Sequence, residues 1–141
     1  MTSITFTGLS IGAMMSAAAA AAAQQPAVEG APQPAMVFFD WAKEEIRRDD
    51  AGTLDEVAEA WRARPAAHLR LAGHTDRSGS AVTNRRAGLR RAQMVRDELE
   101  KRGVPRNAIS IASFGEEQPL VPTEDGVREV QNRRVVIAFE E

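Results

Sequence analysis

The sequence contains no cysteine. Disulfides, thiolate metal sites and cysteine nucleophiles are therefore excluded, and no lipoprotein anchor on an N-terminal cysteine is expected. Aromatic residues are scarce, with five phenylalanines, two tryptophans and no tyrosine. A net charge of −2 and so few rings for base stacking argue against nucleic acid as a partner, even though arginines cluster at residues 85–91.

Charged side chains are absent from residues 2–28, and Glu29 is the first. Within this stretch, Ile4–Met15 is moderately apolar and Ala17–Ala23 is an unbroken alanine run. An apolar segment that ends in small residues predicts a secretory signal over residues 1–23, cleaved before Gln24. The segment has no Lys or Arg near its start, so an uncleaved membrane helix or a low-complexity tail stays open as an alternative.

The rest of the chain is long enough for one domain with its own core. Residues 24–34 contain three prolines and a glycine, which predicts a linker. The domain is then expected to cover residues 35–141.

Hydrophobic periodicity predicts four strands and two helices in this domain. Thr53 and Glu56 have the spacing of a capping box, so we expect the first helix to begin at Thr53 and to stop at Pro65. Trp61 is expected in the core, and Leu89 is expected on the core stripe of the second helix with Ala92, Val95 and Leu99. The expected strands are 34–40, 68–73, 109–114 and 133–139, and the expected second helix is 81–101.

The element order βαβαββ predicts an α/β (α+β) two-layer sandwich. Each helix has one apolar stripe to bury, so the helices are expected on one face of a mixed sheet. Periodicity alone does not fix the order of the strands.

A candidate binding site follows the second strand. Asp76 ends a Gly-His-Thr-Asp turn, and Asn84, Gly88 and Arg91 lie at i, i+4 and i+7, so they share one side of the next helix. A carboxylate and a guanidinium at the mouth of one groove suit a zwitterion. Asp76 could equally cap the helix or pair locally with Arg91, and spacing alone leaves these interpretations open.

Four segments in order carry a family resemblance: Val37–Asp40, Gly73–Asp76, the helix from Asn84 to Ala92, and Gln131–Val135. Together they resemble the OmpA-like C-terminal domain, a peptidoglycan-binding module, over about residues 35–141. The resemblance implies a non-enzymatic domain that holds the diaminopimelate of the peptidoglycan stem peptide and stabilises the cell envelope.

The resemblance assigns the site residue by residue. It implies that Asp76 and Arg91 hold diaminopimelate, with Asn84 and Arg133 as further contacts. Arg133 has two alternative roles, an exposed strand charge or a partner for Glu129. Four more residues are possible groove lining, namely Asp40, Trp41, Thr75 and Gly88, whereas Asn132 is expected to organise the loop before the last strand.

The family also implies partners and a location. Peptidoglycan is the expected partner, together with outer-membrane or periplasmic envelope proteins. The expected location is the periplasm, with the protein bound to the cell wall or outer membrane.

Neither a cofactor nor a metal is expected, because His68 and His74 have no third ligand at useful spacing. Ser78 and Ser80 lie near His74 and Asp76, but no nucleophile-elbow motif accompanies them.

The chain departs from the family at two places, and the first of them, Ala87-Gly88, keeps an alternative function open. The family often has Leu-Ser where this chain has Ala87-Gly88, and a Gly-Arg-Ala run is common where it has residues 127–130. Smaller side chains beside the site would also fit a domain of the same fold that binds envelope proteins through a degraded groove.

Overall fold

The computed structural model of the chain describes residues 32–43 and 45–141. The expected signal segment 1–23 and most of the expected linker lie outside these residues. Residues 32–141 form one unit by their internal contacts. Among the helices of the described part, none has the length and apolar character needed to cross a membrane.

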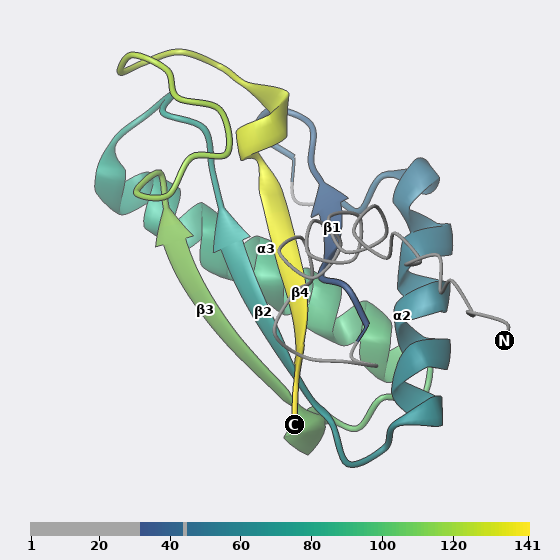
Figure 1. Cartoon of the computed structure of the whole chain (residues 1–141). Helices are drawn as coiled ribbons and strands as arrows, with labels where there is room; N and C mark the ends of the chain where they lie inside the picture. Colours follow the sequence, from purple (N-terminus) through teal and green to yellow (C-terminus); the bar gives the residue numbers. More distant parts are fainter. Residues whose placement is uncertain (1–31, 44) are drawn as a thin grey trace, which may run out of the picture. The chain divides into compact units, whose positions relative to one another are not determined.

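Four strands form one mixed sheet in the order β1-β4-β2-β3 (Figure 1). They are β1 (Ala35–Phe38), β2 (His68–His74), β3 (Ile109–Gly115) and β4 (Arg134–Glu140). β4 runs antiparallel to both β1 and β2, and β3 runs parallel to β2. The expected mixed sheet is therefore confirmed.

Two helices pack against this sheet, α2 (Ala51–Ala63) and α3 (Ala81–Lys101). Three short 3₁₀ helices lie in the connections, η1 (Arg48–Asp50), η2 (Arg106–Ala108) and η3 (Val130–Asn132). The order of strands and α-helices is βαβαββ, as predicted. The bounds of α3 coincide with the prediction because Ser80, whose hydroxyl accepts a hydrogen bond from the backbone amide of Thr83, caps its start.

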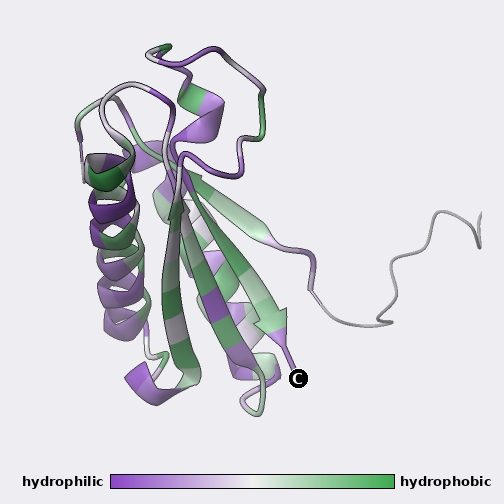
Figure 2. Ribbon diagram, turned by 90° about the vertical axis from the view of Figure 1, so that its left-hand side faces the viewer, coloured by the Kyte–Doolittle hydropathy of each residue, from purple (hydrophilic) through white to green (hydrophobic). Residues whose placement is uncertain are grey.

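The core lies between the sheet and the helices. Alternation along β2 turns Leu69 and Leu71 to the helix side, where both are fully buried. In Figure 2 the strands are largely hydrophobic, whereas the long helix beside them is largely hydrophilic. Each fully buried Leu, Val or Ile contributes about 1.5–3 kcal/mol. The buried cluster comprises Val37, Phe39, Leu54, Val57, Ala58, Leu69, Leu71, Ala92, Val95, Leu99, Val104, Ile109, Val135 and Ile137.

Three expectations about the helices need correction. α2 begins at Ala51 rather than at Thr53, and no side chain caps its start. The Asp50 carboxylate at that end instead accepts a hydrogen bond from the backbone amide of Phe38 in β1 (3.0 Å). Leu89 is 38% exposed, because the buried stripe of α3 passes through Gly88, Arg91 and Ala92 instead. Trp61 packs against the core and is only partly buried.

Two glycines bring α3 into backbone contact with β2. A Cβ atom placed on Gly73 would lie 1.9 Å from the carbonyl oxygen of Gly88, and one placed on Gly88 would lie 2.3 Å from the Ser113 hydroxyl. Only residues without a side chain allow this approach. Gly88 is therefore a helix–sheet contact, which corrects its expected position in the groove.

The directions of the strands place the candidate residues at one end of the sheet. β1 and β2 both run antiparallel to β4, so their carboxyl ends meet the beginning of β4. His74 is paired with Arg134 across the β2–β4 ladder. The Thr75-Asp76 turn and Arg133 consequently lie at the same end of the sheet, beside the start of α3.

Candidate functional site

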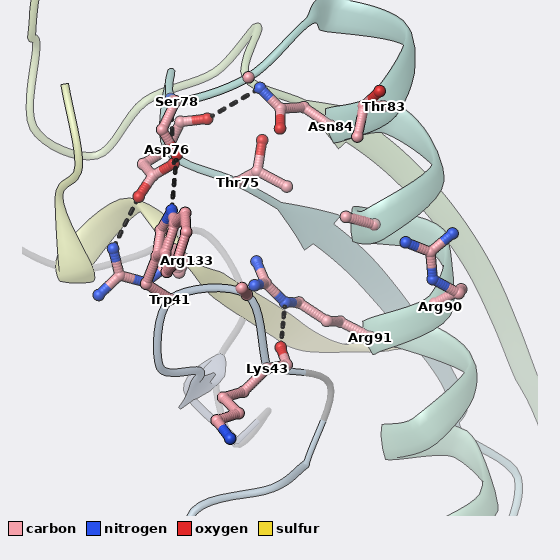
Figure 3. A pocket seen from close by; sticks show the side chains of 13 residues that line it. Trp41, Lys43, Thr75, Asp76, Ser78, Thr83, Asn84, Arg90, Arg91 and Arg133 are labelled. Carbon is pink, nitrogen blue, oxygen red and sulfur yellow. Dashed lines mark hydrogen bonds and ion pairs between the residues drawn. The ribbon is translucent and has the colours of Figure 1, made fainter. Parts of the chain in front are cut away.

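A pocket of about 330 Å³ opens at this end of the sheet (Figure 3). Its wall is built by the segment after β1, the turn after β2, one side of α3 and the residue before β4. The lining residues are Trp41, Ala42, Lys43, Thr75, Asp76, Ser78, Gly79, Thr83, Asn84, Ala87, Arg90, Arg91 and Arg133.

The Asp76 carboxylate receives four hydrogen bonds. Its Oδ1 accepts from the Ser78 backbone amide (3.1 Å) and from the Ser78 hydroxyl (2.5 Å). Its Oδ2 accepts from the Glu129 backbone amide (3.1 Å) and from Nη1 of Arg133 (2.6 Å). The carboxylate thus joins the turn after β2 to the start of β4 and to the loop before it.

These partners keep Asp76 ionised. Burial alone would raise the pKa of Asp76, but hydrogen bonds from the Ser78 hydroxyl and Arg133, then from the backbone amides of Glu129 and Ser78, lower it below its ordinary value. The pocket therefore presents a carboxylate, rather than a carboxylic acid, at neutral pH.

Arg133 is the ion-pair partner of Asp76, and Arg91 is not. The Arg133 side chain is 10% exposed, and its Nε also donates to the Phe39 carbonyl (2.9 Å). Both sequence-based alternatives for Arg133, an exposed strand charge and a Glu129 partner, are wrong. The helix-cap alternative for Asp76 is wrong too, because Ser80 fills that position.

Arg91 enters the pocket from α3. Its Nε donates to the Lys43 carbonyl (3.1 Å), and its guanidinium lies 5.3 Å from the centre of the Phe39 ring. Arg91 is 4% exposed and lines the same pocket as Asp76. The pocket therefore contains both charged groups of the predicted pair.

Asn84 and Thr75 line the same pocket as Asp76 and Arg91 (Figure 3). The Asn84 amide nitrogen donates to the Asp76 carbonyl (3.2 Å) and to the Glu116 carboxylate (3.3 Å), so it fixes the turn on the helix. The Thr75 hydroxyl is buried and has no hydrogen-bond partner in the described part of the chain. A buried hydroxyl without a partner on a pocket wall is suited to contact a ligand.

The possible lining residues divide into two groups. Trp41 and Thr75 line the pocket, whereas Asp40 and Gly88 are not among its lining residues. The Asp40 carboxylate is 67% exposed and lies 3.8 Å from Nε of Arg47. The first strand ends at Phe38, before the expected end at Asp40.

Sequence reasoning missed several lining residues, among them Lys43, Ser78 and Arg90. The position of Ser78 had a signal, because an aspartate side chain often accepts a hydrogen bond from the backbone amide two residues further on. Lys43 follows Ala42, which adopts a left-handed φ of 58° that residues other than glycine rarely adopt. No pattern in the sequence predicts that turn. Asn132, by contrast, organises its loop as predicted, through hydrogen bonds to the backbone of Val121 (2.8 Å each).

A buried histidine lies beside the pocket on β2. Burial, and then the nearby charge of Arg134, lowers the pKa of His74 to about 4. His74 stacks on Phe114 with ring centres 5.4 Å apart. No cluster of three metal-binding side chains occurs in the described residues, so nothing in them joins His68 and His74 in a metal site.

Protonation of His74 is expected to destabilise the fold as pH falls from 6.5 to 4. In this range the unfolded chain binds a proton that the folded chain does not, so the free energy of unfolding should decrease by about 2–3 kcal/mol. Urea unfolding at several pH values measures the effect. The His74→Gln variant should lose this slope, and the matched His68→Gln variant should keep it. An unchanged slope in His74→Gln would assign the pH dependence to other groups.

Comparison with known proteins extends these observations. The model of the OmpA family matches residues 38–133. The chain is 39% identical over 116 residues to an outer membrane protein of Gluconacetobacter diazotrophicus, covering 76% of this chain and 31% of that protein. It is 40% identical over 101 residues to a peptidoglycan-associated lipoprotein of Rhizobium meliloti, covering 71% of this chain and 57% of that protein.

A solved structure has the same fold. The peptidoglycan-associated lipoprotein of Burkholderia pseudomallei superposes with a TM-score of 0.70 at 28% identity, covering 74% of this chain and 89% of that one. The chain spans less than two thirds of the length of the two relatives compared by sequence.

Proposed function

This chain belongs to the OmpA family, and we propose that its pocket binds peptidoglycan non-covalently through the diaminopimelate of the stem peptide. The family is non-enzymatic, so the role that we propose for the pocket is binding rather than catalysis. One observation carries the proposal: a buried carboxylate, Asp76, and a buried guanidinium, Arg91, line one pocket from different elements.

The pocket offers a group of opposite charge to each end of a zwitterion. Asp76 accepts hydrogen bonds from the ligand ammonium, and Arg91 donates to the ligand carboxylate. Arginine suits this role because its planar guanidinium matches a carboxylate with two parallel hydrogen bonds. Thr75, whose hydroxyl has no partner in the described part of the chain, supplies a further polar contact.

Affinity for one stem peptide is expected to be modest. Each hydrogen bond to a charged group contributes about 1.5–3 kcal/mol, and association itself has a cost. A cell-wall polymer repeats the ligand many times, so rebinding prolongs retention. Such a domain would hold the cell wall in place from the periplasm, together with outer-membrane or other envelope proteins.

Co-sedimentation with purified sacculi of the diaminopimelate type tests the proposal. We expect the wild type to sediment, and Arg91→Ala and Asp76→Asn to remain in the supernatant. Loss of one charge-assisted contact weakens binding roughly ten- to a hundredfold. Asparagine preserves the size of Asp76, and circular dichroism verifies that both variants fold.

Arg86→Ala is the matched control, because Arg86 is exposed on the same helix and does not line the pocket. This variant should sediment like the wild type. If the wild type stays in the supernatant, or if Arg91→Ala and Asp76→Asn sediment equally well, the domain does not bind peptidoglycan through this pocket. The alternative, an envelope protein-interaction module of the same fold, would then be favoured.

A further inference from the structure

The hydrogen bonds on Asp76 leave no acceptor position for a ligand. A carboxylate has about four acceptor sites, two on each oxygen. Ser78 occupies Oδ1 with its amide and its hydroxyl, while Glu129 and Arg133 occupy Oδ2. An ammonium group that binds Asp76 must therefore replace one of these donors.

The four donors differ in how readily they can leave. The amides of Ser78 and Glu129 belong to the backbone, and Glu129 is fixed at the start of η3. Arg133 is charged, buried and also bonded to the Phe39 carbonyl. The Ser78 hydroxyl is neutral and leaves by rotation about one side-chain bond. It is the donor whose displacement costs least.

A tryptophan holds this hydroxyl in place. Nε1 of Trp41 donates to the Ser78 hydroxyl oxygen (3.1 Å), which directs the hydroxyl hydrogen toward Asp76. A hydroxyl that accepts a hydrogen bond becomes a stronger donor. On the face of the Trp41 ring, the Arg128 guanidinium lies 3.4 Å from the ring centre. Trp41 is nevertheless 45% exposed at the pocket wall.

We infer that the Ser78 hydroxyl, positioned by Trp41, competes with the ligand ammonium for Asp76 and is displaced when the ligand binds. This inference rests on the proposed function and describes what controls ligand binding at the same pocket. Ser78 thereby lowers the affinity of the pocket for ammonium ligands, because its hydroxyl must first leave Asp76. Trp41 loses its hydrogen-bond acceptor on binding and thereby reports occupancy.

Calorimetric titration with meso-diaminopimelate tests the inference. Ser78→Ala frees one acceptor site, so we expect it to bind roughly two- to tenfold more tightly than the wild type, as the removal of one neutral competing hydrogen bond predicts. Ser110→Ala, which changes an exposed serine on β3, should bind like the wild type. Trp41→Phe keeps an aromatic side chain and removes the N–H, so it should bind more tightly than wild type by a smaller factor. This variant decides the question if Ser78→Ala does not fold.

Fluorescence provides a second readout. The chain has two tryptophans, and Trp61→Phe leaves Trp41 as the only emitter. In that background the ligand should shift the Trp41 emission, and ligand-free Ser78→Ala should already emit like the saturated protein. Wild-type binding with equal or weaker binding by Ser78→Ala would overturn this inference and leave the proposed function standing. No wild-type binding to sacculi or to meso-diaminopimelate would overturn both.

Discussion

Replacing Gly73 with alanine is expected to lower the free energy of unfolding by about 3 kcal/mol, at the upper end of the usual cost of overpacking. The new methyl group would lie 1.9 Å from the Gly88 carbonyl oxygen, which is a backbone atom of α3. Relief requires the helix to move away from β2, and the contacts of Val95 and Leu99 with the core move with it. Thermal unfolding should show a melting temperature lower by roughly 10 °C or more.

Gly52→Ala is the matched control for this prediction. Gly52 lies in α2, and a Cβ atom there would meet nothing within 4 Å. Alanine favours a helix over glycine by up to about 1 kcal/mol, so this variant should be as stable as the wild type or slightly more stable. Equal stability of Gly73→Ala and the wild type would contradict the close packing of α3 on β2.

The second large effect is expected at Arg133. Arg133→Ala removes the charged partner of a buried carboxylate, and such a change destabilises a fold by about 3–5 kcal/mol. The Asp76 side chain is 4% exposed, so water replaces the lost partner poorly. Urea unfolding at neutral pH measures the loss. The pKa of Asp76 should rise at the same time.

Two comparisons isolate the ion pair. Arg70→Ala removes an exposed arginine on β2 that lies 3.4 Å from Glu140, and it should cost less than about 1 kcal/mol. The double variant Asp76→Ala with Arg133→Ala should be more stable than the sum of the two single changes predicts, because neither charge is left buried alone. Additive effects would show that the pair is not coupled.

The layers of the fold could be predicted because alternation and helical periodicity are local. Leu69 and Leu71 identify a strand face, and Ser80 marks the start of α3. The start of α2 could not be predicted in the same way. Thr53 has the sequence of a cap, but Asp50 is bonded to Phe38 of β1 and the helix begins earlier.

The sequence predicted that the residues of the candidate site lie near one another, but not which of them form an ion pair. Asp76 and Arg91 share a pocket, as their positions after β2 and on α3 suggest. The partner of Asp76 is nevertheless Arg133, which is 57 residues away in the chain. Only the position of β4 between β1 and β2 brings it there, and no local pattern encodes strand order.

Gly88 illustrates the same limit. Its place on the Asn84–Arg91 side of α3 suggested a wall of the groove. Because Gly88 has no side chain, α3 can instead approach Gly73 on the neighbouring strand closely. A glycine in a helix marks a close approach or a loss of stability, and sequence does not distinguish the two.

Sedimentation with two kinds of sacculi tests the central claim most directly. Diaminopimelate offers an ammonium and a carboxylate at its free end, whereas the lysine of lysine-type peptidoglycan offers the ammonium alone. If Asp76 and Arg91 act together on a zwitterion, the wild type will sediment with diaminopimelate-type sacculi and remain in the supernatant with lysine-type sacculi. Equal sedimentation with both would contradict the account.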